Sequence, residues 1–113
     1  MQRAAPSWAW WRNVLGMVRT FQPFVARVCA SRCGSLVCIA SVAGFRGLPR
    51  ASAYSASKAA AISYLESLRV ELRGSGVAVT TLCPGYIATP MTARNPYPMP
   101  FMLTVEQAAK KCT

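Results

Sequence analysis

Two kinds of hydrophobic pattern follow one another in the first part of the chain. Between residues 13 and 28, apolar side chains recur at spacings of three and four, which predicts an amphipathic helix that is bent or unsettled near Pro23. Gly34 and Ser35 end this pattern. The apolar run 36–40 has the length of a strand and is bounded by Gly and Ser, so we expect a fully buried strand there.

The next segment carries the clearest helical signal in the chain. Residues 52–73 are rich in Ala, Leu, Ser and Glu and are followed by two glycines, which predicts a helix over this range. Residues 77–83 form a second β-branched and apolar run, ended by a Pro-Gly pair. Strand, helix and strand in this order imply two parallel strands joined by a right-handed crossover.

The last segment is irregular and then helical. Five prolines between residues 84 and 100 predict a loop, which is a candidate lid. Thr104 and Gln107 form a capping-box pattern that predicts a C-terminal helix. The expected fold class is therefore α/β, in a single domain. A two-stranded sheet cannot cover its own edges or bury both of its faces, so we expect this chain to be a fragment of a larger fold.

The charge of the chain is strongly unbalanced. There are 13 Lys or Arg and 3 acids, a net charge of +10, and residues 1–50 contain no acid. Surfaces that bind nucleic acid or anionic membranes usually gather Lys and Arg in runs or on one face, and the sequence has no such run. We attribute the excess to a missing acidic portion and predict no nucleic acid and no membrane as partners. A basic nucleic-acid binder is an alternative, whereas no apolar window before residue 36 is long enough to span a membrane.

The cysteines favour a reducing compartment. They are five in number, and there is no histidine to complete a common zinc site. Cys29 and Cys33 are four apart, a spacing that would place them on one face if both were helical, but a metal or redox role for them needs further ligands. We therefore predict free or buried thiols, no metal and a cytoplasmic location, although the Arg-rich and acid-poor N-terminus also resembles a transit peptide.

A candidate for proton chemistry lies at the start of the predicted long helix. Tyr54 and Lys58 are four residues apart and so share one helical face. A phenol with an ordinary pKa of about 10 exchanges protons poorly at neutral pH. An ammonium about 4 Å away stabilises the phenolate by on the order of 4 kcal/mol at an effective dielectric of 20. Ser41 follows the first predicted strand, at the edge where open α/β sheets bind ligands.

The combined pattern resembles the short-chain dehydrogenase/reductase family. It consists of Ser41, Tyr54 thirteen residues later, Lys58, and then a strand followed by Pro-Gly-x-Ile-x-Thr, residues 84–89. Upstream, Asn13 begins the sequence Asn-Val-Leu-Gly, which is similar to the family's helix that carries a catalytic Asn. The resemblance covers about residues 13–112 and implies the C-terminal half of a Rossmann-like, doubly wound parallel sheet. Residues 13–113 are then a partial domain of this family, and residues 1–12 are unassigned.

The resemblance implies an oxidoreductase that uses NAD or NADP on a small-molecule alcohol or ketone. Tyr54 would exchange the proton with the substrate oxygen, Lys58 would stabilise its phenolate and bind the nicotinamide ribose, and Ser41 would polarise the substrate oxygen. Asn13 would support a water that links Lys58 to solvent. The cofactor-binding residues it implies at the nicotinamide end, besides Tyr54 and Lys58, are Pro84, Gly85, Ile87 and Thr89. The full-length family also implies a homodimer or homotetramer.

One part of the family's pattern is missing from the sequence. In the family, a Gly-x-x-x-Gly-x-Gly turn binds the dinucleotide, and its backbone amides donate hydrogen bonds to the pyrophosphate. This chain has no such segment. We therefore expect a truncated enzyme with weakened cofactor binding. The alternative is a non-catalytic interaction module, since the family's oligomer interface uses the Asn-bearing and Tyr-bearing helices. The residues that would supply its close-packing face are Ala56, Ala59, Ala60, Leu65 and Leu68.

Overall fold

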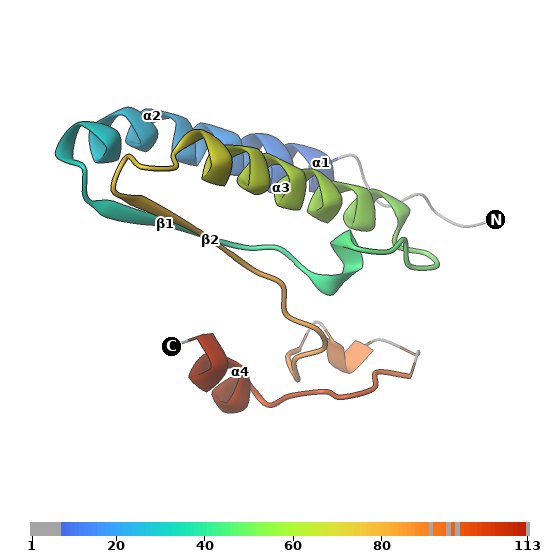
Figure 1. Ribbon diagram of the computed structural model, residues 1–113. Coiled ribbons are helices and arrows are strands. Elements are labelled where there is room, and N and C mark those ends of the chain that lie inside the picture. Colours follow the sequence, from blue (N-terminus) through green and yellow to red (C-terminus); the bar gives the residue numbers. More distant parts are fainter. Residues whose placement is uncertain (1–7, 91, 95, 97, 113) are drawn as a thin grey trace.

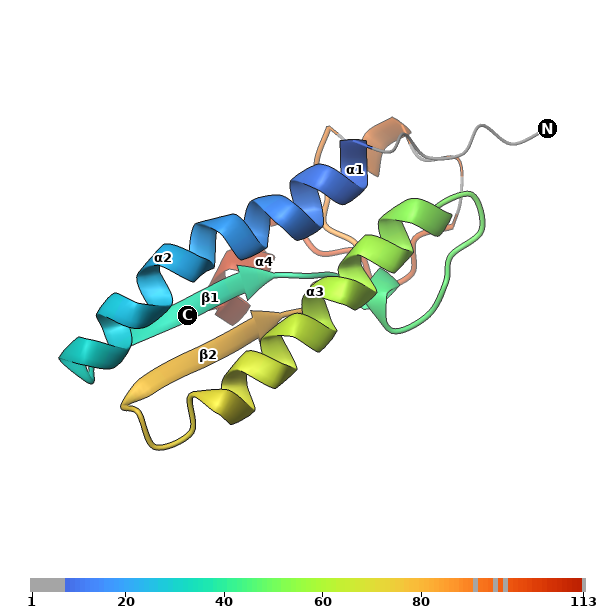
Figure 2. The same ribbon diagram turned by 90° about the horizontal axis from the view of Figure 1, so that it is seen from above.

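The fold places two long helical segments on one side of a small parallel sheet (Figure 1, Figure 2). The computed structural model describes residues 8–90, 92–94, 96 and 98–112. In chain order the elements are α1 (Trp8–Trp10), the π-helical η1 (Trp11–Leu15), α2 (Gly16–Ser31), β1 (Gly34–Ile39), the 3₁₀ turn η2 (Val42–Gly44), α3 (Ser52–Glu71), β2 (Val77–Leu82), the 3₁₀ turn η3 (Thr92–Arg94) and α4 (Val105–Cys112). This is the α/β arrangement expected from the sequence.

The N-terminal helical segment is longer than the sequence predicts, and its irregular turn lies at a different place. It begins at Trp8, and α2 continues through Pro23 as one helix, so the expected unsettled region near this residue is absent. Pro23 is exposed, and the backbone carbonyl one turn before it, at the exposed Arg19, can be satisfied by water instead of an N–H. The irregularity lies earlier, in the π turn, where the N–H of Gly16 donates to the Trp11 carbonyl.

The sheet consists of β1 and β2, which pair in parallel with Leu36 opposite Val79. The predicted parallel pair is thus confirmed. The prediction of a fully buried first strand is wrong, because alternate residues of β1 are exposed, including Val37 at 52% and Ile39 at 61%. Helices α2 and α3 cover only one face of the sheet, so side chains on the other face remain accessible (Figure 1).

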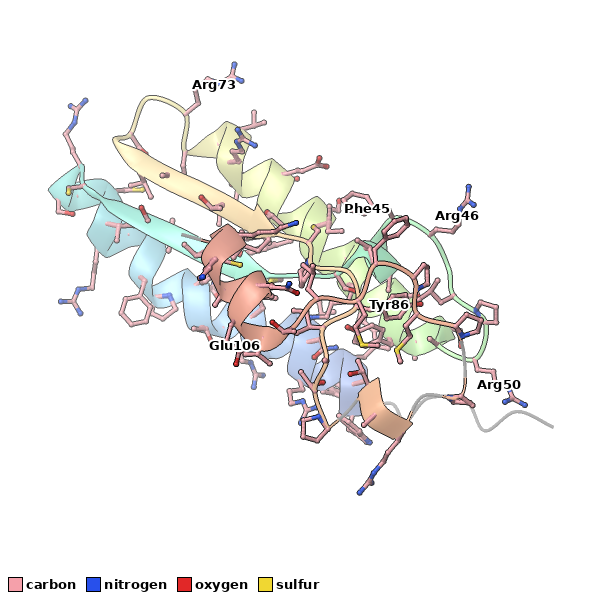
Figure 3. All side chains as sticks on the ribbon, turned by 90° about the horizontal axis from the view of Figure 1, so that it is seen from below. Phe45, Arg46, Arg50, Arg73, Tyr86 and Glu106 are labelled. Atoms are coloured by element: carbon pink, nitrogen blue, oxygen red, sulfur yellow. The ribbon has the colours of Figure 1, made fainter. Side chains whose placement is uncertain are left out.

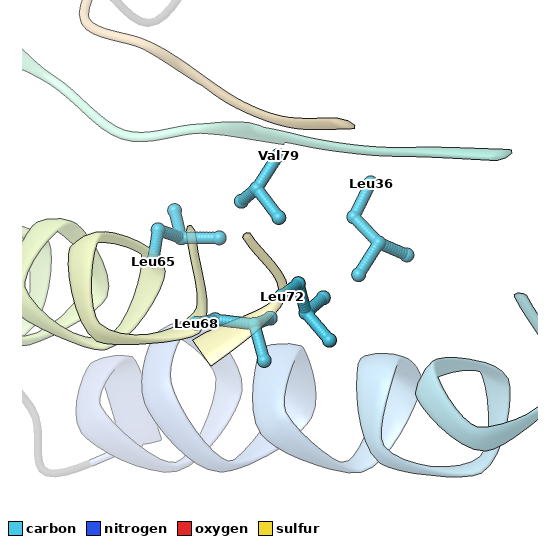
Figure 4. Packing of buried hydrophobic residues seen from close by; sticks show 5 residues of the cluster. All are labelled: Leu36, Leu65, Leu68, Leu72 and Val79. Carbon is cyan, nitrogen blue, oxygen red and sulfur yellow. The ribbon is translucent and has the colours of Figure 1, made fainter. Parts of the chain in front are cut away.

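The hydrophobic core lies between the sheet and the two long helices (Figure 4). Partly buried side chains from α2, among them Met17 and Phe21, close this core from the N-terminal helix. The buried cluster consists of Leu36, Leu65, Leu68, Leu72 and Val79.

This core changes the expected interaction face of α3. Leu65 is fully buried and Leu68 is 5% exposed, so neither side chain belongs to a surface that a second molecule can reach. Ala56 and Ala59 are exposed and Ala60 is half-buried. The prediction was wrong for the two leucines because they point into the chain's own core, on the sheet side of the helix.

The chain leaves the sheet after β2 and returns through a loop to α4. The predicted capping box is present: the Thr104 N–H donates to Gln107 Oε1 at 2.9 Å and the Gln107 N–H donates to Thr104 Oγ1 at 3.2 Å. A short parallel bridge joins Ile87 to Leu103 and ties the two ends of the loop together. Among the described residues, no helix has the length and apolarity needed to cross a membrane.

Candidate active site

Ser41 lies where the two strands end and their chains separate. Backbone pairing continues just beyond the sheet, with Ala40 N–H donating to the Leu82 carbonyl at 2.7 Å and Val42 N–H to the Pro84 carbonyl at 3.1 Å. Ser41 then caps η2, its hydroxyl accepting from the Ala43 N–H at 3.1 Å. Because the hydroxyl oxygen is the acceptor in this bond, its proton is still available to a substrate oxygen.

Gly44 fixes the distance between this turn and α3. A Cβ on Gly44 would lie 2.6 Å from Ile62 Cδ1 and 2.9 Å from the Lys58 carbonyl oxygen, closer than real side chains approach. The backbone of η2 therefore packs directly onto the turn of α3 that carries Lys58. Any larger residue would push Ser41 and that turn apart.

Tyr54 and Lys58 lie together on α3, as their spacing predicts. The Lys58 Nζ is 5.7 Å from the centre of the Tyr54 ring. It also donates to the carbonyl of Ile39, at the end of β1, at 3.1 Å. This bond anchors the ammonium between the end of the first strand and the tyrosine ring.

Asn13 is connected to this region through Ser57, a residue that no sequence pattern indicated. The Asn13 Nδ2 donates to the Ser57 hydroxyl at 3.0 Å, and that hydroxyl donates to the Tyr54 carbonyl at 2.7 Å. Ser57 is fully buried. Asn13 lies within the π turn η1, an irregularity that is frequent at functional sites. Its amide is thus joined to the backbone of the tyrosine by one intervening hydroxyl.

A cavity of about 510 Å³ brings several predicted residues together. Ser41, Tyr54 and Gly85 all line it, and a Cβ on Gly85 would meet no atom within 4 Å, so open space lies beside this glycine. Figure 3 shows Tyr86 on the loop after β2, and Arg50 on the loop between η2 and α3 with its guanidinium pointing outward. The remaining lining residues are Val42, Ala43, Leu48, Pro49, Arg50, Ala51, Tyr86 and Thr92.

Two residues predicted for the nicotinamide end are held within the loop instead of lining this cavity. Ile87 forms the bridge to Leu103, and its carbonyl accepts from the Thr92 hydroxyl at 2.7 Å. The Thr89 N–H donates to the same hydroxyl at 2.8 Å. Thr92 therefore organises the loop after β2, and Pro84 joins the site through its backbone contact with Val42.

Cys38 is a partly buried thiol on β1. Burial raises the pKa of Cys38 above the ordinary 9.0, although the Lys58 charge opposes this shift. Cys38 Sγ donates to Met17 Sδ at 3.5 Å, in the layer between β1 and α2. All five cysteines are free, and no cluster of metal-ligating side chains occurs in the described part of the chain.

Sequence reasoning missed Ser57, Gly44 and Thr92. Ser57 stands between Tyr54 and Lys58, so its place in the motif was visible, but only the fold shows that its hydroxyl faces Asn13. Gly44 was visible in the sequence as a glycine shortly after the first strand, but no sequence pattern indicated its contact with α3. Thr92 is three residues after Thr89, the spacing of a local side-chain turn.

Comparison with known proteins identifies the family. A sequence model of the short chain dehydrogenase family matches residues 10–98. The chain belongs to the short-chain dehydrogenase family. The match includes the residues around the cavity and begins three residues before Asn13.

Individual relatives agree with this assignment. An uncharacterized oxidoreductase of Myxococcus xanthus is 44% identical over 98 residues, which cover 87% of this chain and 39% of the relative. The 3-oxoacyl-[acyl-carrier-protein] reductase FabG of Thermotoga maritima is 37% identical over 84 residues, covering 74% of this chain and 34% of the relative. The chain therefore spans less than half the length of these curated relatives.

Solved structures show the same fold. A short chain dehydrogenase from Burkholderia cenocepacia, in complex with NADP, superimposes with a TM-score of 0.83 at 27% identity, covering 97% of this chain and 46% of that one. The F189W actinorhodin polyketide ketoreductase with NADPH gives a TM-score of 0.66 at 37% identity, covering 72% of this chain and 32% of that one. The two-layer arrangement described above is thus part of a larger Rossmann-type sheet in these neighbours.

Proposed function

We propose that this chain carries the proton-transfer residues of an NAD(P)(H)-dependent oxidoreductase that interconverts an alcohol and a ketone. The observation that supports the proposal is one cavity lined by both Ser41 and Tyr54, with the Lys58 ammonium anchored beside the tyrosine ring. A hydroxyl that can donate, a phenol and a fixed positive charge are the groups that a carbonyl reduction needs.

Each residue of the site has a distinct role in the proposed reaction. The Ser41 hydroxyl donates to the substrate carbonyl oxygen and orients it. Tyr54 gives its phenolic proton to the same oxygen during reduction and removes it during oxidation. Lys58 stabilises the phenolate that forms. Asn13 positions the first turns of α3 through Ser57, since its amide holds the hydroxyl that bonds to the Tyr54 carbonyl.

The residues of the site fit the nicotinamide end of a dinucleotide. Open space lies beside Gly85 within the cavity, where a flat ring can approach the backbone of residues 84–86. When bound, the cofactor supplies or accepts the hydride. NADP in the Burkholderia neighbour and NADPH in the ketoreductase support this choice of cofactor. The sequence has no Gly-x-x-x-Gly-x-Gly turn for the pyrophosphate, so we propose that the 113-residue chain binds the cofactor weakly.

The cavity favours an apolar ketone. Val42, Leu48, Pro49 and Tyr86 contribute apolar surface to its wall, and the only charged residue among its described lining is Arg50. The names of the reductase relatives, a 3-oxoacyl-[acyl-carrier-protein] reductase and a putative ketoacyl reductase of Streptomyces coelicolor, support a carbonyl substrate attached to an acyl chain. The five free thiols support a reducing, cytoplasmic setting.

Turnover by the purified chain tests the proposed chemistry. NADPH-dependent reduction of short acyl ketones would be followed at millimolar cofactor, to compensate for weak binding. We expect Tyr54→Phe to lower turnover by about 10²–10⁴, the usual contribution of general acid–base catalysis. The matched control is Tyr64→Phe, which removes a phenol from the same helix at the half-buried edge of the core. Equal activity in the two variants would refute the role of Tyr54.

Cofactor titration tests the second part of the proposal. We expect NADH and NADPH to bind without saturation in the micromolar range. Lys58→Met should weaken this binding further, because it removes a donor near the proposed ribose site. Tight, saturable binding to the monomer would contradict the proposed weakness.

An interaction role is a second candidate, supported by the exposed small residues of α3. Ala56 and Ala59 leave room for a second helix to approach closely. Light scattering would detect such an oligomer, and Ala56→Glu should dissociate it. An oligomer without Tyr54-dependent turnover would favour this candidate over the enzyme.

A further inference from the structure

The loop between η2 and α3 holds an arginine at the mouth of the candidate active site. Arg50 is the only charged residue among the described lining of the cavity that Ser41 and Tyr54 also line. The residue is exposed, and Figure 3 shows its guanidinium pointing outward. One positive charge therefore stands on the solvent side of a cavity whose described lining is otherwise uncharged.

The backbone fixes the position of this arginine. Residues 48–51 form a turn that is closed by a hydrogen bond from the Ala51 N–H to the Leu48 carbonyl at 3.1 Å. The Leu48 N–H donates to the Ser55 hydroxyl at 3.2 Å, and Ser55 is buried near the start of α3. The turn is thus tied directly to the helix that carries Tyr54.

Arginine is an unusual residue at its place in this turn. Pro49 occupies the second position, and Arg50, at the third, has a φ of 61°. These are the features of a type II turn, whose third position usually holds glycine or asparagine because a larger side chain crowds the backbone at positive φ. Strained residues of this kind gather at ligand-binding sites, which is a reason to assign a function to the Arg50 side chain.

The acids of the chain lie away from this loop. Glu66 and Glu71 are in the second half of α3, and Glu66 lies fourteen residues, about 21 Å, from the end of the helix that the loop joins. Figure 3 shows Glu106 on a different part of the molecule from Arg46 and Arg50. Arg46 is also exposed and adds a second positive charge to the loop. The local potential therefore attracts anions.

We propose that Arg50 binds an anionic group at the end of the substrate that lies away from the reacting carbonyl. The substrate class is then a ketone, or the corresponding alcohol, with an apolar body and a carboxylate or phosphate end. A guanidinium donates two parallel hydrogen bonds to either oxyanion. Ser41, Tyr54 and Arg50 line one cavity of about 510 Å³, so a single small molecule can reach all three. This assignment rests on the proposed oxidoreductase function and adds a charged end to the apolar ketone proposed there.

The phosphates of the cofactor are the competing occupant. The proposed nicotinamide site lies beside Gly85, after β2, whereas Arg50 belongs to the loop before α3. Substrate and cofactor thus meet different segments of the chain, and the effect of one substitution on each can be measured separately.

Ligand binding without cofactor tests the inference on the complete 113-residue chain. Ligand-observed NMR titration would compare short methyl ketones of increasing length that end in a carboxylate with the methyl ester of each. At the best length we expect the acid to bind about three- to tenfold more tightly than its ester, and salt should reduce this preference because the guanidinium is exposed. A second series would end in a phosphate, and the series that binds more tightly identifies the end group.

Substitutions of the arginine assign the preference to its charge. Arg50→Gln should bring the ratio of the two dissociation constants close to one. Arg50→Lys should keep part of the preference, since the charge remains while the paired hydrogen bonds are lost. The matched control is Arg73→Gln, which removes an exposed arginine beyond the far end of α3 and should leave the ratio as it is (Figure 3). Circular dichroism would show that each variant is folded.

Several results would overturn the inference. One is equal binding of acid and ester at every length, and another is a preference that survives in Arg50→Gln. If Arg50→Gln weakened NADPH binding as much as binding of the keto acid, the arginine would belong to the cofactor site. Failure of the proposed reaction would look different, because Tyr54→Phe would leave turnover unaltered while the preference for the anion, measured without cofactor, would persist.

Discussion

The buried hydroxyl of Ser57 provides a sharp test of how the site is built. It accepts from Asn13 Nδ2 at 3.0 Å and donates to the Tyr54 carbonyl at 2.7 Å. Ser57→Ala deletes both bonds and leaves the Asn13 amide without this partner in a partly buried position. The Tyr54 carbonyl lies within α3 and keeps its helical hydrogen bond, so most of the loss in stability comes from the Asn13 amide, which loses its acceptor. We expect the free energy of unfolding to fall by about 1–3 kcal/mol.

Urea denaturation followed by circular dichroism would measure this loss. Ser63→Ala is the matched control, because Ser63 is exposed on the same helix and should change stability by less than about 0.5 kcal/mol. A double-mutant cycle with Asn13→Ala isolates the pair, and we expect a coupling energy above about 0.5 kcal/mol. Coupling near zero, or equal effects of the two serine variants, would refute the link between η1 and α3.

Further predictions concern the turn after β1, the last helix and the buried thiol. Gly44→Ala should destabilise the fold by about 1–3 kcal/mol in urea denaturation, because its Cβ would collide with α3, whereas Gly47→Ala meets open space and should be neutral. Thr104→Ala should weaken α4 by about 1 kcal/mol, measured by amide hydrogen exchange in that helix, and unchanged protection would contradict the cap. Burial raises the pKa of Cys38, so the unfolded chain loses this proton first and stability should fall as the pH rises through 9.0. Cys38→Ala should reduce that fall, and an identical pH dependence in the variant would contradict it.

The order of elements and the position of Tyr54 and Lys58 could be predicted because they depend on local spacing. Residues four apart on a helix meet whatever the helix packs against. The capping box at Thr104 was predictable for the same reason, since its two hydrogen bonds join residues three apart.

The wrong predictions concern features that depend on tertiary packing, which local sequence patterns do not encode. An apolar strand was expected to be buried on both faces. Ile39 is exposed because α2 and α3 pack on the other face of the sheet, and α4, on this side, lies apart from it (Figure 1). Leu65 and Leu68 looked suitable for an interface, yet the direction of α3 over the sheet turns them inward. The contact of Ser57 with Asn13 joins residues 44 apart, and no local pattern encodes it.

The central claim is that Tyr54 transfers the proton. Its most direct test is a chimera in which a relative provides the rest of the fold. The segment of the Thermotoga maritima reductase that matches this chain would be replaced by the corresponding residues of this chain. Turnover of its 3-oxoacyl substrate would then be measured with NADH and with NADPH. If Tyr54 transfers the proton, the chimera is active, Tyr54→Phe lowers its turnover by about 10²–10⁴, and Tyr64→Phe leaves it nearly unchanged. An active chimera whose turnover is the same with and without the Tyr54 hydroxyl would contradict the account.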